Sequence, residues 1–220
     1  ERASGESLPA FTRKRIFEPL GMTSTSWRDD AMRVVKGRAL SYDKDSSGWQ
    51  GERAVENIYG NCCLLTTVGD LLKWNAAFDS TRLGAGLRAE QERRGVLNNG
   101  RTITYAAGLF VDTWRGQPWV GHSGATPRYR ANLVRYTGGG AGVSVAVLCN
   151  AGNADPEAAS DSLADALVRF EPRSTPAAPV RVTVPPSALA DKAGVPGLAY
   201  NPSADQKSWA ELLKFFKKDL

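Results

Sequence analysis

Four strand-like runs in the middle of the chain limit the folds open to it more than any other feature. Glycine, proline or Arg-Gly turns separate the runs, which cover residues 102–114, 118–126, 129–136 and 142–149. Short runs rich in β-branched and aromatic residues between such turns are typical of strands. Connections of only a few residues join antiparallel neighbours, because a parallel crossover needs a dozen or more. The sequence therefore predicts an antiparallel meander.

The region before these strands is predicted to be mostly irregular. Ser7 can cap a short first helix, which we expect to end near Glu18 because Pro19 pushes the residue before it out of the helical region. Residues 28–60 then mix charged residues, Gly and Ser with isolated aromatic residues, and neither a helical nor a strand period persists. We interpret this segment as rich in loops.

Two longer helices flank the strands. The motif Thr67-x-x-Asp70 is a capping box that opens the first of them, and the apolar stripe expected on it has Val68, Leu71, Leu72 and Phe78. Asp155 and Pro156 are suited to begin the other, whose expected apolar face has Ala159, Leu163, Ala166, Leu167 and Phe170. Together with the meander, they predict an α+β fold in which helices flank an antiparallel sheet.

Composition excludes several classes of protein. The chain has 220 residues with an apolar fraction of 42% and a charged fraction of 23%, which is ordinary for a soluble globular protein with a sizeable core. Its net charge of +5 comes from scattered Arg and Lys residues rather than from a basic face with stacking aromatics, so we expect no nucleic-acid partner. No apolar run approaches the roughly 18 residues of a membrane span.

Metal and cofactor sites are not expected either. Cys62, Cys63 and Cys149 have no spacing typical of a disulfide framework or a C-x-x-C site. The chain has a single histidine and no His-Glu-x-x-His pattern, so the usual ligand set of a transition metal is missing.

That single histidine, His122, lies in the stretch that most resembles a site. The stretch is Gln117-Pro118-Trp119-Val120-Gly121-His122-Ser123-Gly124-Ala125-Thr126, an apolar run that changes into small residues. Glycine in a strand allows another backbone or a ligand to approach closely. We interpret the stretch as a strand that lines a site, although an isolated histidine on a strand is more often only packed or solvated.

A second pattern, Ser41-Tyr42-Asp43-Lys44, matches the Ser-x-x-Lys motif of nucleophilic serine enzymes. In that motif a lysine one helical turn after the serine takes its proton. The flanking residues favour a turn rather than the helix that the motif requires, so we do not assign Ser41 as a nucleophile.

Five short motifs occur along the chain in an order that resembles the serine β-lactamase-related family, which includes class C β-lactamases, D-alanyl-D-alanine carboxypeptidases and esterases. The resemblance covers residues 1–170, and the motifs are Ile16-Phe17-Glu18-Pro19-Leu20-Gly21-Met22, Leu64-Leu65-Thr66-Thr67-Val68-Gly69-Asp70-Leu71, Tyr105-Ala106-Ala107-Gly108-Leu109, Gly121-His122-Ser123-Gly124 and Val145-Ala146-Val147-Leu148-Cys149-Asn150.

The resemblance implies a serine hydrolase that forms an acyl-enzyme with a lactam, a D-alanyl peptide or an ester. It places the family's Lys-Thr-Gly or His-x-Gly motif on His122-Ser123-Gly124. His122 would then assist proton transfer or hold a substrate carboxylate, Ser123 would offer its hydroxyl to the substrate, and Ala125 would lend its backbone N–H to the oxyanion hole. The partner is a small-molecule or peptide acyl substrate, and an exported or periplasmic location is what the family suggests.

The sequence departs from the family where the nucleophile is expected. The Ser-x-x-Lys and Tyr-x-Asn motifs normally precede the Pro-Leu-Gly-Met turn, and neither occurs before Pro19. We therefore expect residues 1–170 to be the C-terminal half of the domain, which needs the missing N-terminal half. The alternative is a non-catalytic module that binds peptides or peptidoglycan. Residues 171–197 are predicted to be a Pro-rich linker and 198–220 a divergent helical tail.

Overall fold

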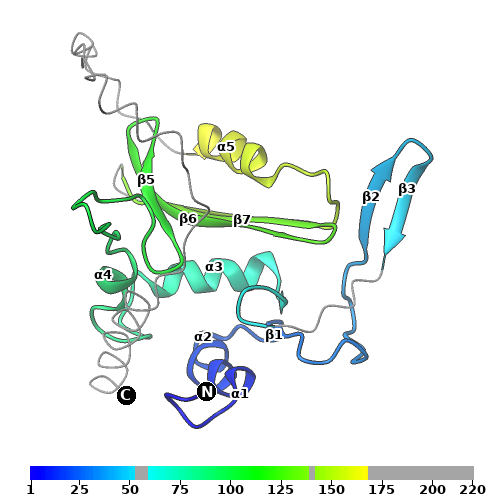
Figure 1. Cartoon of the computed structure of the whole chain (residues 1–220), viewed down its shortest axis with the longest axis horizontal. Coiled ribbons are helices and arrows are strands. Elements are labelled where there is room, and N and C mark those ends of the chain that lie inside the picture. The colour runs from blue at the N-terminus through cyan, green and yellow to red at the C-terminus, as the bar shows by residue number, and fades with distance from the viewer. Residues whose placement is uncertain (53–58, 139–141, 168–220) are drawn as a thin grey trace. The chain divides into compact units, whose positions relative to one another are not determined.

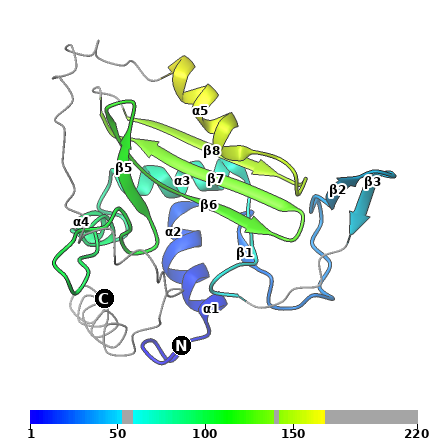
Figure 2. The same cartoon turned by 45° about the horizontal axis from the view of Figure 1, so that its top comes forward.

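The predicted meander forms a four-stranded antiparallel sheet in the computed structural model, which describes residues 1–52, 59–138 and 142–167. The strands lie in the order β5-β6-β7-β8 (Figure 2), and their bounds are Phe110–Trp114, Gln117–Thr126, Tyr129–Tyr136 and Val143–Cys149. Each strand pairs with the one before it in the chain, which confirms the meander. The predicted linker and helical tail lie outside the described residues.

The first strand begins at Phe110 and not, as predicted, at Thr102. The residues before it fold back on themselves: Ile103 N donates to Gly95 O at 2.9 Å, and Gly95 N donates to Tyr105 O at 2.8 Å. These bonds use backbone groups that a longer β5 would have needed for pairing with β6. The apolar alternation in this segment therefore belongs to a local turn.

Helices cover both faces of the sheet, which confirms the α+β class. Figure 1 shows α5 (Pro156–Leu167) and α3 (Val68–Ala77) on opposite sides of it. On the α5 side, Ala164 belongs to a buried cluster with Val134 and Val145 of the sheet. On the α3 side, the amide of Asn75 donates to the carbonyl oxygen of Val134 at 3.3 Å.

The face of α5 that packs on the sheet differs from the prediction. Its buried residues are Pro156, Ser160 and Ala164, whereas Leu163 is 46% exposed and Leu167 60% exposed. Small side chains four residues apart let the helix approach the strands closely, and the hydroxyl of Ser160 is satisfied within the helix by the carbonyl oxygen of Pro156 at 2.8 Å. The predicted start is correct, since Asp155 Oδ1 accepts from Ala158 N at 2.9 Å.

Helix α3 begins as predicted but buries only part of the predicted stripe. Thr67 Oγ1 accepts from Asp70 N at 3.2 Å, the bond of an N-cap. Val68 and Leu72 are 46% and 41% exposed, while Phe78 at the end of the helix is buried.

The carboxylate of Asp70 joins α3 to the turn that follows the N-terminal helices. It accepts hydrogen bonds from Ser24 N, Thr25 Oγ1 and Lys73 Nζ, each at 2.8 Å. Burial opposes the charge, but the hydrogen bonds from Lys73, Thr25 and Ser24 outweigh it and lower the pKa of Asp70 below its ordinary value of 3.8.

The N-terminal helical segment continues past the predicted end at Glu18. It consists of α1 (Leu8–Thr12), a π-helical turn η1 (Arg13–Phe17) and α2 (Glu18–Leu20), and it ends at Gly21 in the left-handed conformation with φ +67°. The π-helical turn already interrupts the regular hydrogen-bond ladder before Pro19, so the missing N–H of proline costs little there. The predicted cap is confirmed, because Ser7 Oγ accepts from Ala10 N.

Part of the predicted loop at 28–60 is a hairpin. Strands β2 (Ser41–Asp45) and β3 (Gly48–Glu52) pair antiparallel, and Asp45 Oδ1 accepts from Ser47 N at 2.7 Å in the turn. This side chain supplies the turn that the sequence signalled, but the flanking polar residues hid the strands. The remaining elements are β1 (Ser26–Trp27), which pairs with β4 (Leu64–Leu65), and helix α4 (Leu87–Gln91).

We predict that Asp70→Ala destabilises the protein by about 1–3 kcal/mol, because it removes the charged acceptor of the hydrogen bonds from Ser24 N, Thr25 Oγ1 and Lys73 Nζ. Asp70→Asn keeps the shape and removes the charge. Since the folded-state pKa is lowered, the stabilisation is present above pH 3.8 and is lost as the pH falls through the lower folded-state value. The difference in the free energy of unfolding between wild type and Asp70→Asn, measured with urea, should therefore become smaller as the pH falls below 3.8. A difference independent of pH would contradict this.

Candidate active site

Strand β6 is paired unequally on its two sides. It pairs with β7 from Trp119 to Thr126, but with β5 only from Gln117 to Gly121. Among the described residues, His122–Thr126 therefore has no strand partner on the β5 side. Unpaired backbone groups at a sheet edge can accept an extended ligand as an added strand. This half-paired segment contains all the site residues predicted from the sequence.

The two glycines of β6 at positions 121 and 124 differ in how much space surrounds them. A Cβ at Gly121 would lie 2.5 Å from the carbonyl oxygen of Leu133 and 2.9 Å from Cα of Val134. No side chain fits there, so Gly121 permits the close approach of β7. A Cβ at Gly124 would meet only the Cβ of Ala131, at 3.5 Å, which is an ordinary contact. Packing therefore does not require a glycine at position 124.

His122 lies exposed on β6 and is held by two hydrogen bonds and two aromatic rings. Its Nε2 is 3.0 Å from the hydroxyl oxygen of Tyr105, and its Nδ1 contacts the carbonyl oxygen of Ser123. Its ring centroid is 5.7 Å from that of Tyr105 in an edge arrangement and 5.3 Å from that of Phe110. The imidazole therefore has a fixed orientation beside the unpaired edge.

The structure does not bring the three residues of the predicted motif to one face. Side chains alternate along a strand, so His122 and Gly124 share one face, and Ser123 lies on the other. Ser123 is half-buried opposite Asn132, which is buried. Ala125 lies exposed in the unpaired segment, where an oxyanion-hole residue is expected.

A cavity of about 950 Å³ opens at the Gly124–Thr126 end of this segment. Its walls come from the β6–β7 turn, the end of β8, residues 23–28 and 35–39, and residues 60–67 before α3. His122 is not among the lining residues. The cavity is therefore beside the predicted oxyanion position and is reached from His122 along the edge of β6.

The charged side chains among the described lining residues of the cavity are all basic. Its described lining residues include no Asp or Glu, and the basic ones are Arg28, Lys36, Arg38 and Arg130. Arg38 Nε is buried and has no hydrogen-bond partner within the described part of the chain. A concave surface lined by one sign of charge concentrates ligands of the opposite sign, so this cavity suits an anionic group.

The structure places the Ser41-x-x-Lys44 pattern in β2, so the helix that the motif needs is absent, as the sequence indicated. Ser41 is completely buried. Residues three apart in a strand point to opposite faces, which prevents Lys44 from acting as the base for Ser41.

Tyr105 is the residue that sequence reasoning missed. It belongs to one of the motifs quoted above, but its role could not be assigned, because 17 positions separate it from His122. The local turn at 95–105 and the left-handed Gly108, with φ +76°, return the chain so that Tyr105 meets the start of β5. The only available signal was an aromatic residue shortly before a Gly-Leu turn.

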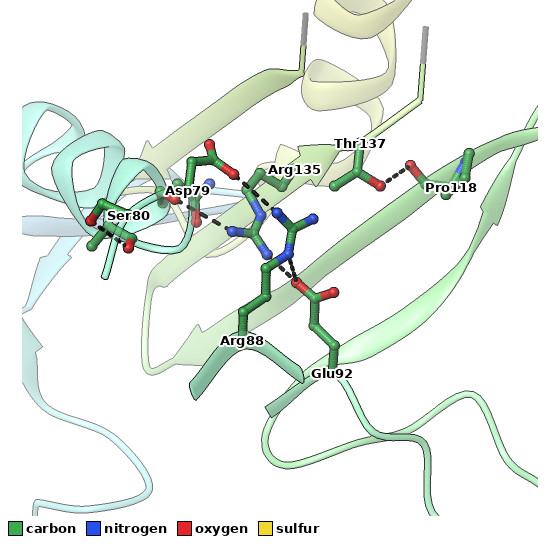
Figure 3. Close-up of polar contacts among 9 residues, drawn as sticks. Asp79, Ser80, Arg88, Glu92, Pro118, Arg135 and Thr137 are labelled. Carbon is green, nitrogen blue, oxygen red and sulfur yellow. Dashed lines mark hydrogen bonds and ion pairs between the residues drawn. The ribbon is translucent and has the colours of Figure 1, made fainter. Parts of the chain in front are cut away.

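A buried ion pair fixes the segment that leads to Tyr105. Arg135 of β7 donates to Glu92 just after α4, and its guanidinium also lies 4.7 Å above the ring of Phe78. Figure 3 shows that Arg88 and Asp79 belong to the same network. Arg88 Nε lies 3.0 Å from Glu92 Oε1, and Arg88 Nη1 lies 3.1 Å from Asp79 Oδ1. Burial lowers the pKa of Arg135, and Glu92 opposes that effect.

The residues that the structure describes contain no cluster of three or more His, Cys, Asp or Glu side chains able to hold a metal ion. In the same residues, every helix is too short or too polar to cross a bilayer.

The chain is similar to proteins of one family. A family model described as Beta-lactamase matches residues 1–170. Similar solved structures include a penicillin binding protein from Bacillus halodurans, with a TM-score of 0.61, 19% identity and coverage of 73% of this chain and 51% of that one. A D-stereospecific amidohydrolase from Streptomyces sp. has a TM-score of 0.57 and 18% identity, and the match covers 75% of this chain and 49% of the other.

FmtA from Staphylococcus aureus gives a TM-score of 0.60 at 16% identity, over 78% of this chain and 46% of that one. At such identities the likeness concerns the fold alone. The chain spans about half the length of these structures. No curated protein shows significant similarity to the chain.

The two glycines of β6 allow a matched test. We predict that Gly121→Ala destabilises the protein by about 1–3 kcal/mol, the usual cost of forcing an atom into a filled space. Gly124→Ala should change the stability by less than about 0.5 kcal/mol. Chemical unfolding of both variants measures this, and equal losses would contradict the close contact between Gly121 and β7.

Proposed function

Because the chain belongs to the β-lactamase family, we propose that it forms the substrate-binding part of a serine hydrolase that cleaves a small acyl substrate through an acyl-enzyme. The observation that carries the proposal is the unpaired segment His122–Thr126 of β6, which places the only histidine on a strand edge next to a cavity. A peptide-like acyl substrate can bind to such an edge, because its own amide groups can pair with the unpaired backbone groups.

In this proposal, Ala125 N–H supplies one donor of the oxyanion hole. Acyl transfer places negative charge on the carbonyl oxygen, and one fixed donor for that oxygen is worth about 3–4 kcal/mol of transition-state stabilisation. His122 assists proton transfer, and Gly124 leaves room for the substrate. The orientation of Ser123 gives its hydroxyl a less direct role than the family motif implies.

The basic cavity favours a substrate that carries a carboxylate. Arg38, Lys36 and Arg130 line the cavity together with Gly124–Thr126. A negative group of the substrate would therefore be attracted into the cavity while the reacting carbonyl lies at Ala125. Among lactams, D-alanyl peptides and esters, we therefore propose a substrate with a free carboxylate, and a neutral ester is the less suitable ligand.

The nucleophile is proposed to come from outside the described residues of this chain. No serine of the described residues has a lysine one helical turn later, and Ser41 with Lys44 lies in a strand. The alternative of a non-catalytic binding module is favoured by this same observation, since the edge and the cavity can hold a peptide without chemistry. We call this chain joined to the N-terminal half that the family resemblance implies the full-length protein, and its acylation distinguishes the two.

We predict that the 220-residue chain alone is not acylated by a penicillin or a fluorophosphonate probe, because its single Ser-x-x-Lys pattern, at Ser41 and Lys44, lies in a strand and not on the helix that the motif needs. Intact-mass analysis after incubation measures this. A stoichiometric adduct located on Ser41 by peptide mapping would contradict the prediction, and adduct formation in the full-length protein alone would support the hydrolase over the binding module.

In the full-length enzyme, we predict that His122→Ala lowers kcat/KM about 100-fold, the low end of the effect of losing a proton-transfer group. Tyr42→Phe, which removes an exposed hydroxyl on β2, is the control and should keep wild-type activity. If His122→Ala retains activity within about twofold while its unfolding curve is unchanged, the role given to His122 is wrong.

A further inference from the structure

We propose that Tyr105 is a positioning residue for His122: its hydroxyl hydrogen bond holds the imidazole in one neutral tautomer and one orientation. The effect of Tyr105 on catalysis rests on the proposed function. The contact itself is a property of the fold and is measurable without a substrate.

The two hydrogen bonds of His122 define the tautomer. A carbonyl oxygen only accepts hydrogen bonds, so the contact of Nδ1 with Ser123 O requires a proton on Nδ1. In the neutral imidazole Nε2 is then the acceptor, and the hydroxyl of Tyr105 donates to it at 3.0 Å. Both ring nitrogens are therefore assigned, one by a backbone group and the other by Tyr105.

Ring packing adds to this orientation. The rings of Tyr105 and Phe110 meet edge to face with centroids 4.9 Å apart, and each also packs against His122. Such pairs contribute about 0.5–1.5 kcal/mol beyond their buried area. A Tyr105→Phe substitution keeps this packing and removes only the hydroxyl, so it separates the hydrogen bond from the ring contacts.

Tyr105 is itself held by the sheet. Its carbonyl oxygen accepts from Gly95 N at 2.8 Å, and nearby Ala107 N donates to Gln91 O at 3.2 Å. The next residue, Glu92, forms the buried pair with Arg135 of β7 (Figure 3). The hydroxyl of Tyr105 is therefore placed by bonds that begin in β7, the strand that also pairs with His122.

The consequence for the proposed reaction is that the lone pair of Nε2 points at Tyr105 before substrate binds. His122 then enters the reaction in the tautomer whose Nε2 lone pair can accept a proton. Losing the partner that orients a functional histidine costs about tenfold or more at metal sites, and we expect a similar loss here, in kcat rather than in KM.

Nitrogen-15 NMR of the full-length protein with labelled histidine tests the proposal. His122→Gln identifies the His122 signals by their absence. At mildly alkaline pH, wild type should show a protonated Nδ1 and a hydrogen-bonded lone pair on Nε2. In Tyr105→Phe the Nε2 signal should shift and the Nε2–H tautomer should appear, while Tyr42→Phe leaves the spectrum unchanged.

Two results would overturn the proposal: an Nε2–H tautomer in wild type, or a Tyr105→Phe spectrum identical to that of wild type. The activity arm is a separate measurement. Where the enzyme is active, Tyr105→Phe should lower kcat about tenfold with KM changed by less than about twofold, and an unchanged kcat would contradict the positioning role. An inactive full-length protein would refute the proposed function, and the spectra would still decide the role of Tyr105.

Discussion

The unequal pairing of β6 is the constraint on which the rest of this structure depends. Backbone hydrogen bonding to β7 holds the strand straight through Thr126, while β5 leaves it after Gly121. The close approach of β7 at Gly121 makes the first half of the strand rigid. The second half thus combines a fixed backbone with an open side, and a binding site needs both.

Two buried charges connect other parts of the chain to this sheet. Asp70 joins α3 to the N-terminal turn, and Arg135 joins β7 to the segment after α4. A buried charge is costly unless its partners are in place, so each requires one arrangement of its neighbours. Both charges therefore act mainly by fixing the positions of neighbouring segments. Asp70 holds Ser24 and Thr25 in the wall of the cavity, and Arg135 holds the segment that leads to Tyr105.

The sequence was sufficient for most of the four-stranded meander and for the helix starts, but not for the start of β5 or for the packed faces. Glycine and proline turns bound strands β6 and β7, and Thr67 and Asp155 cap their helices, because these are local effects of single residues. The side of α5 that meets the sheet is chosen by Ser160 and Ala164, whose small size matters only once a second surface is present. The hydrophobic pattern had predicted Leu163 and Leu167 on the buried face of α5 instead.

The candidate site was predictable to a similar extent. His122 could be found because the chain has a single histidine in a strand that ends in small residues, and the family resemblance gave its neighbours roles. Its contact with Tyr105 could not be found, because it depends on the turn at 95–105 and on where β5 begins. The hairpin β2–β3 was missed because polar residues on both strands hid the strand pattern, although the turn at Asp45 was indicated by the sequence.

The position of β7 between two strands also sets a gradient of local stability across the sheet. Its residues pair with β6 on one side and with β8 on the other, so its amide protons exchange with solvent only when the whole sheet opens. Outward amides of His122–Thr126 have no strand across from them and exchange through small local fluctuations. The proposed site therefore lies where backbone paired on both sides borders an edge that has no strand partner among the described residues, and a ligand pairing with that edge would extend the slow-exchanging core by one strand.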